Sequence, residues 1–358
     1  MVRNWLMTSA AALGLLLAAG CAGTDHYEQD RALATAAFKA GNYAVAAQRF
    51  ESNVYRAERF GPNDPRLAAS LNDLGLTYFH LAKYKAAESL FLRARNIQES
   101  GVGPDHPDVA ETLNNLAFLY VELGRYREAE PLYHRALSIQ ERTLGEESVE
   151  VATTLNNLAR LYEAEARYAD SVPLSLRSIE ILEALKLDRH PYMAASLNNL
   201  GTLYTGLARY PDAEPLYLEA VDITRDKLGP AHPQIAASLN NLAALYVAEG
   251  RTAEAEPLYR EALAMARGTL GVSHPQTARV LMNMGVMYAD QGRYSAAVPL
   301  LEEALAIREK HLPSDHILMA ETLEETATAL RGVGQVAKAD SLDRRAQQIR
   351  NEPSGGAS

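Results

Sequence analysis

The chain has 358 residues, with 35 Lys and Arg against 45 Asp and Glu, and therefore a formal net charge of -10. This acidic balance argues against binding a nucleic-acid backbone, which requires a basic surface. Hydrophobic residues make up 47% and charged residues 22%, which is typical of an ordered chain and not of a disordered one. The single Cys excludes an internal disulfide framework and a multi-cysteine metal site.

The N-terminus has the pattern of a secretion signal. Arg3 precedes an apolar run from about Trp5 to Leu17, and small residues then lead to Cys21. The run is shorter than the roughly 20 residues that a membrane-spanning helix needs, so it fits the apolar region of a signal peptide. We expect residues 1–20 to be removed.

The residues from Leu17 to Cys21 resemble the lipobox of bacterial lipoproteins, although Ala18 replaces the more common Leu. The resemblance implies that Cys21 carries the lipid and that the protein is attached to a membrane through it. Ala22, in place of the Asp that retains many lipoproteins at the inner membrane, favours the outer membrane facing the periplasm of a bacterial envelope. An uncleaved anchor, or ordinary cleavage beside an incidental Cys, stays open. Residues 21–27 are predicted to be a short tether.

A repeat with a period of 42 residues fills the rest of the chain. Its anchor is LNNL or a variant, and a degenerate copy lies upstream around Gly41 and Phe50. The seven anchors begin at Leu71, Leu113, Leu155, Leu197, Leu239, Leu281 and Leu323.

Each copy has the pattern of a helical hairpin. Leu113, Leu116 and Tyr120 lie on one face of a first helix that starts after His106 and ends near Gly124. The same spacing recurs on a second helix from about Tyr126. A lone hairpin buries too little to be stable, so the copies must stack. The sequence thus predicts an all-α superhelix, a solenoid of about eight helical hairpins over residues 28–350, followed by a disordered tail at 351–358.

The recurring columns of Leu, small residues and Tyr resemble the tetratricopeptide repeat, and the 42-residue period with LNNLA and AEPLY resembles its kinesin light chain type. The resemblance covers about residues 28–350. It implies a right-handed superhelix whose first helices line a concave groove that holds extended peptides or other protein segments.

A second column of Asn lies on the face that the resemblance assigns to this groove. Its members are Asn115, Asn157, Asn199, Asn241 and Asn283. A carboxamide donates and accepts, so such a row can pair with the backbone of a bound chain whatever its sequence. The alternative is that the side chains bond one another and only hold the helices in register. The first column, which includes Asn114 and Asn156, lies nearer the core, and we expect it to be structural.

Specificity in the groove should come from its variable positions, of which we single out Phe118, Arg160 and Arg279. They favour a partner segment that is apolar near the first copies and acidic near the third.

The sequence contains no phosphate-binding loop, clustered metal ligands or nucleophile elbow. We therefore predict no catalytic residues, metal or cofactor. The His column, which includes His106, His190, His232, His274 and His316, is expected to start helices and not to bind zinc, because its members are too far apart.

These features predict an envelope lipoprotein that acts as a protein interaction scaffold or assembly factor. Its partners would be protein segments, and it would contact the membrane through its lipid but bind no nucleic acid. Two alternatives stay open, namely a receptor for a small molecule or glycan and an accessory subunit of an envelope enzyme or secretion complex.

Overall fold

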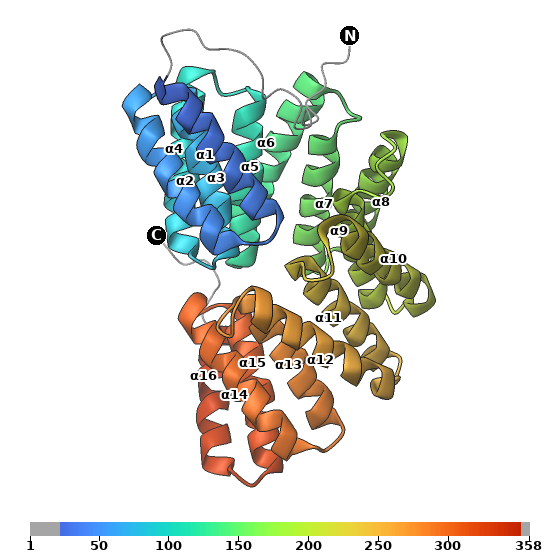
Figure 1. The fold of residues 1–358 in the computed structure, drawn as a ribbon. Coiled ribbons are helices and arrows are strands. Elements are labelled where there is room, and N and C mark those ends of the chain that lie inside the picture. Colours follow the sequence, from blue (N-terminus) through green and yellow to red (C-terminus); the bar gives the residue numbers. More distant parts are fainter. Residues whose placement is uncertain (1–21, 352–358) are drawn as a thin grey trace.

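The computed structural model describes residues 22–351, and the predicted signal peptide, Cys21 and residues 352–358 lie outside this range. The described chain forms sixteen α-helices in eight antiparallel hairpins (Figure 1), which confirms the predicted fold class. The hairpins are α1 (Ala22–Lys39) with α2 (Tyr43–Ala57), α3 (Pro65–His80) with α4 (Tyr84–Gly101), α5 (Pro107–Glu122) with α6 (Tyr126–Leu144), α7 (Val149–Ala164) with α8 (Tyr168–Ala184), α9 (Pro191–Gly206) with α10 (Tyr210–Leu228), α11 (Pro233–Ala248) with α12 (Thr252–Thr269), α13 (Pro275–Asp290) with α14 (Tyr294–His311), and α15 (Ile317–Gly332) with α16 (Val336–Asn351). A short 3-10 turn, η1 (Glu58–Phe60), follows α2.

From the second hairpin onward, the first helix of each hairpin begins at a side-chain cap. In α13, for example, Nδ1 of His274 accepts a hydrogen bond of 3.1 Å from the backbone N–H of Gln276, and Pro275 occupies the first helical position. This satisfies one of the N–H groups that a helix start leaves without an intrahelical partner. The same cap is made by His106, His190, His232 and His316. The predicted helix-start role of the His column is confirmed.

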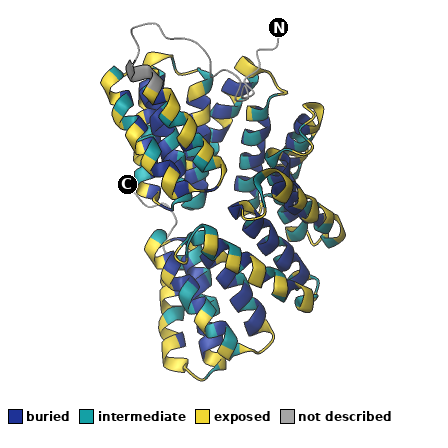
Figure 2. Ribbon diagram, in the orientation of Figure 1, coloured by how far each residue is buried: buried dark blue, intermediate teal, exposed yellow. Residues whose placement is uncertain are grey.

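The core lies between the two helices of each hairpin and between neighbouring hairpins, as the buried faces in Figure 2 show. Large rings on the second helices pack against small residues on the first helices. Tyr133 and Tyr217 are almost fully buried, and the ring of Tyr217 lies against Gly201 so closely that an added Cβ would be 2.8 Å from it. The small-residue column of the sequence therefore provides room for the aromatic column.

The first helix begins earlier than expected. Residues 22–27, predicted to form a tether, are the first residues of α1. Tyr27 is 1% exposed, and its hydroxyl donates a hydrogen bond to the Arg66 carbonyl at 3.0 Å. The backbone carbonyl of Tyr27 accepts a hydrogen bond of 2.8 Å from Nδ2 of Asn53. These bonds fix the start of α1 on α2 and α3, so the segment is helical and not an extended linker.

The superhelix closes on itself. The N-terminal hairpins lie directly beside the C-terminal ones, while α7 to α10 connect them on the other side (Figure 1). Nε2 of His274, at the start of α13, donates to the carbonyl of His80 at 2.9 Å, across 194 residues of chain. One hairpin earlier, Pro233 lies against Gly41 so closely that a Cβ at this glycine would be 2.7 Å from the ring.

The same type of contact, between the start of a first helix and the turn of another hairpin, closes the superhelix at three places. The start of a C-terminal first helix meets the turn of a hairpin five repeats upstream: α11 meets the α1–α2 turn, α13 meets the α3–α4 turn, and α15 meets the α5–α6 turn. At the third place, Nε2 of His316 lies where a Cβ on Gly124 would be 3.2 Å away. Leu312 adds an apolar contact, since it packs against the core cluster around Tyr84 and Leu119. The closed arrangement encloses the inner faces of the first helices.

Candidate functional site

The enclosed space is a cavity of about 2400 Å³, lined by the first helices from α5 to α15 and by the loops of the closing contacts. Of the residues singled out from the sequence, Asn199, Asn241, Asn283, Arg160 and Arg279 line it together. Asn115, Asn157 and Phe118 are not among the residues that line this cavity.

The second Asn column bonds the neighbouring hairpin. In four of its five members, Nδ2 donates to Oδ1 of the first-column Asn of the preceding hairpin, and Asn241 instead lies 3.5 Å from Thr202 Oγ1. The four bonds are Asn115 to Asn72 at 3.1 Å, Asn157 to Asn114 at 3.2 Å, Asn199 to Asn156 at 3.0 Å and Asn283 to Asn240 at 3.1 Å. The columns thus form a ladder that holds the first helices in register. Each second-column amide keeps one N–H for another partner, so contact with a ligand stays a prediction.

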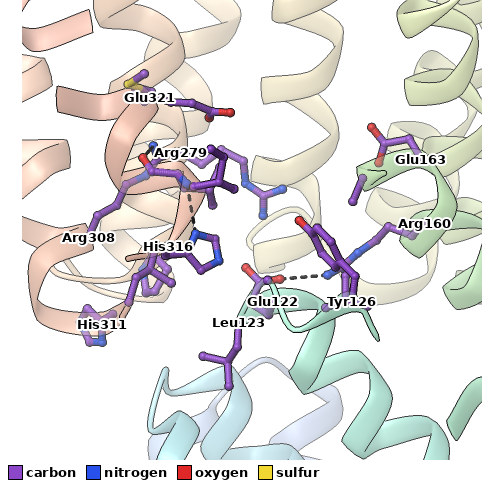
Figure 3. Close-up of a pocket in the computed structure, with 18 of the residues that line it drawn as sticks. Glu122, Leu123, Tyr126, Arg160, Glu163, Arg279, Arg308, His311, His316 and Glu321 are labelled. Atoms are coloured by element: carbon purple, nitrogen blue, oxygen red, sulfur yellow. Dashed lines mark hydrogen bonds and ion pairs between the residues drawn. The ribbon is translucent and has the colours of Figure 1, made fainter. Parts of the chain in front are cut away.

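Phe118 and Arg160 are also joined to neighbours. The guanidinium of Arg160 lies 4.3 Å from the ring centroid of Phe118, which itself packs against Phe79. Nη2 of Arg160 pairs with Glu122 at 2.9 Å (Figure 3). Because Glu122 already supplies an acidic partner, Arg160 is a weaker candidate for a contact with an acidic ligand than its sequence position suggests.

Arg279 is an unpaired cation of the cavity. It extends from α13 towards Glu122 and Arg160 (Figure 3). It is exposed and, within residues 22–351, forms no hydrogen bond and no ion pair. An arginine in this situation keeps all five N–H donors for a carboxylate or a carbonyl of a bound chain.

The cavity also holds carboxyl groups that the sequence reading did not identify. Burial opposes ionisation of Glu122, but Arg160, Arg279 and His316 outweigh it and lower its pKa. Glu163 differs, because burial raises its pKa and the two arginines offset only part of the effect. The cavity wall therefore carries both signs of charge, with Arg160 and Arg279 close enough to Glu122 to lower its pKa. No sequence signal could have placed these groups together, since they come from hairpins far apart in the chain.

The three histidines at the closing contacts are His232, His274 and His316. They are neutral in this geometry, because Nδ1 accepts the cap bond while Nε2 faces the turn of the N-terminal hairpin. Burial lowers the pKa of His232, His274 and His316, and the backbone carbonyls of Lys39, His80 and Glu122 respectively offset part of the decrease. His80 lies among these groups, stacked on Tyr43 at 4.5 Å, and burial together with His274 and His232 lowers its pKa to about 4.

Among the described residues no group of three or more His, Cys, Asp or Glu side chains could hold a metal ion. In the same part of the chain, none of the helices has the length and apolar character to cross a membrane.

The fold and the cavity define a class of protein, an all-α superhelical repeat protein with an enclosed inner surface. The sequence profile of the tetratricopeptide repeat matches residues 28–100, 76–142, 108–184, 150–226, 192–268 and 234–310, so the chain belongs to the tetratricopeptide repeat family.

Two solved Rap-protein structures give the same fold. A Rap protein complexed with Competence and Sporulation Factor is similar with a TM-score of 0.64 and 14% identity, over 92% of this chain and 99% of that chain. The apo form of RapI gives a TM-score of 0.55 and 17% identity, over 79% of this chain and 97% of that chain. The nearly identical TPR-like repeats of a Podosopora anserina kinesin light chain are 29% identical, with a TM-score of 0.44, over 57% of this chain and 97% of that chain. The search of curated proteins gave no significant match.

Proposed function

We propose that the protein is an interaction scaffold that holds a segment of a partner protein inside the closed superhelix. The observation that carries this proposal is the large cavity inside the closed superhelix, with the unpaired Arg279 on its wall. Its volume of about 2400 Å³ is larger than the roughly 300 to 1000 Å³ of sites that hold small molecules. A protein segment is therefore favoured over a small ligand.

The cavity wall offers complementary groups to such a segment. Arg279 would pair with a carboxylate or a chain carbonyl, and the free N–H groups of Asn199 and Asn283 would donate to its backbone. The Rap protein of similar fold was solved with a second molecule, its Competence and Sporulation Factor, and this supports a binding role for the fold.

The test is a cross-linked pull-down from cells of the source organism with wild type and Arg279→Ala. The matched control is Arg344→Ala, which removes an exposed arginine of α16 that does not line the cavity. We expect at least one partner that is enriched with wild type and the control but reduced tenfold or more with Arg279→Ala. Equal recovery with both variants would count against the cavity as the binding surface.

We also propose that the scaffold is attached to a bacterial envelope membrane by a lipid on Cys21, with the outer membrane favoured. The proposal rests on the sequence, in which Cys21 directly precedes α1. A lipid there would place the first hairpin at the membrane surface.

Metabolic labelling with palmitate and cell fractionation test the anchor. Wild type should carry the label and sediment with membranes, whereas Cys21→Ser should lose the label. A soluble, unlabelled wild-type protein would contradict the proposal.

A further inference from the structure

A bridge of three side chains joins most neighbouring hairpins. Glu130 of α6 accepts a hydrogen bond of 2.9 Å from the Tyr162 hydroxyl and one of 3.1 Å from Nη1 of Arg167, both from the next hairpin. The guanidinium of Arg167 also lies 3.9 Å from the centroid of the Tyr162 ring. The equivalent sets are Glu88 with Tyr120 and Arg125, Glu214 with Tyr246 and Arg251, and Glu256 with Tyr288 and Arg293. At the α2–α3 junction Glu51 accepts from Tyr78 instead.

The junction between α8 and α9 keeps the cation and the hydroxyl but has lost the carboxylate. Val172 stands where the other bridges have Glu, while Arg209 still lies 4.1 Å from the centroid of Tyr204. Leu207 stands where Glu165 and Glu249 bond the equivalent arginines. Among the described residues Arg209 forms an ion pair with Asp212 alone, on the helix that it starts, at 2.8 Å, and its guanidinium also contacts the Tyr204 hydroxyl.

The exposed fractions agree with this loss. The side chain of Arg209 is 50% exposed, against 45% for Arg293, 39% for Arg167 and 33% for Arg251, which keep the bridging carboxylate. The junction between α14 and α15 gives the opposite case. There Val298 again replaces Glu, but Leu330 and Gln335 replace the Tyr and the Arg, so no polar group is left without its partner.

Exposed leucines lie at this junction and on the following hairpin. Leu176 lies one helical turn after Val172, at the position where His134 contacts Tyr162 in the preceding hairpin, and it is 39% exposed. Leu207 is 40% and Leu218, the next member of the Leu176 column, is 49% exposed. We call this surface the α8–α10 patch, and it consists of Val172, Leu176, Tyr204, Leu207, Arg209 and Leu218.

We propose that the α8–α10 patch is a docking site for a partner protein segment that presents an Asp or Glu between apolar side chains. The carboxylate of the partner takes the place that Glu130 occupies at the preceding junction, between the Tyr204 hydroxyl and the Arg209 guanidinium. Its apolar neighbours cover Leu176, Leu207 and Leu218. None of the patch residues lines the cavity, so a scaffold of this kind has room for two partners at once.

The test is a selection of random 12-residue peptides displayed on phage against the full chain. Val172→Glu restores the internal carboxylate and should fold, because the same residue stands at the equivalent position of other junctions. Val298→Glu is the matched control, since it makes the same change where neither the Tyr nor the Arg is present.

We expect the enriched peptides to carry an acidic residue flanked by apolar ones. They should bind Val172→Glu at least tenfold more weakly than wild type, and bind Val298→Glu and Arg279→Ala like wild type. Replacing the acidic residue of the peptide by its amide should have an effect of similar size. Arg209→Gln provides a second variant that must also lose binding.

Three outcomes overturn the proposal: no enrichment, enriched peptides without an acidic residue, or equal affinity for wild type and Val172→Glu. If the peptides lose binding to Arg279→Ala instead, they occupy the cavity. That result would support the function proposed above and refute the second site.

Discussion

At the residue scale, a single neutral imidazole performs two tasks at the closing contacts. His274 caps α13 through Nδ1 and donates through Nε2 to the carbonyl of His80. His106 makes the cap and lies 3.6 Å from the Asp108 carboxylate but makes no closing contact, and its side chain is 40% exposed. The two positions therefore separate the capping contribution from the closing contribution.

We predict that His106→Ala lowers the free energy of unfolding by about 1 kcal/mol, the usual cost of losing a cap. His274→Ala should lower it by about 2 to 3 kcal/mol, because a buried carbonyl also loses its donor. Urea denaturation of both variants gives the comparison. Equal losses would mean that the His274 contact with His80 contributes nothing to stability.

The low pKa of His80 predicts an acid-sensitive fold. In the unfolded chain the imidazole titrates near 6.5, but in the folded protein its pKa is about 4. The contribution of neutral His80 to the free energy of unfolding is therefore fully present above about pH 6.5. It is lost as the pH falls to 4, because the unfolded state then binds the proton more tightly than the folded state does. We expect a loss of about 2 to 3 kcal/mol over this range.

His80→Phe isolates that contribution, since Phe can stack on Tyr43 without titrating. His274 and His232, which face His80, add to the acid sensitivity in the same direction. Glu111 has the opposite effect on the pH dependence of stability, because burial and the nearby Asp73 and Asp108 raise its pKa to about 7 and protonation of this carboxyl favours the folded state. Between pH 7 and pH 4 the urea midpoint of wild type should fall relative to that of His80→Phe, because only wild type carries the titrating imidazole, and parallel curves would refute the assignment.

At the scale of the helix, the hairpin depends on small residues that make room for rings. We predict that Gly201→Ala lowers the free energy of unfolding by about 1 to 3 kcal/mol, because its Cβ would lie 2.8 Å from the Tyr217 ring. Gly268→Ala is the control. This glycine is also in a helix but has open space around it, so Ala should stabilise by about 0.5 to 1 kcal/mol. Thermal unfolding measures both, and a loss in both variants would contradict the packing argument.

The same scale shows what the sequence could predict. Helix boundaries, caps and core faces follow from neighbours within a few residues, so the pattern from Leu113 to Tyr120 was enough to predict α5. The Asn columns were identified, but their pairing was left open. The structure shows that they pair across a distance of one repeat, as Asn157 does with Asn114.

At the scale of the whole molecule, prediction from sequence reaches its limit at closure. The contact between His274 and His80 spans 194 residues and depends on the rotation accumulated over five hairpins. Each rotation is set by packing details, including the Gly41 turn, that a periodic pattern does not encode. For the same reason the sequence placed Arg160 and Arg279 on a groove but did not show that the groove is enclosed.

Closure also changes how a partner would reach the inner surface. In an open superhelix a segment could enter from the side along the whole groove. Here the contacts of α11, α13 and α15 with the N-terminal turns block that route. Entry then requires either threading through an opening or separation of the closing contacts.

The most direct test of this account is a spin-label distance measurement across the closing contact, with Cys21→Ser and labels at Lys83→Cys and Ser314→Cys. Both positions line the cavity in loops that the closed structure brings near each other, on the N-terminal and C-terminal sides. A closed superhelix predicts one short, narrow distance distribution at neutral pH, which His274→Ala and acid should broaden. A broad distribution at long distances in the wild-type protein at neutral pH would contradict closure, and with it the enclosed binding site.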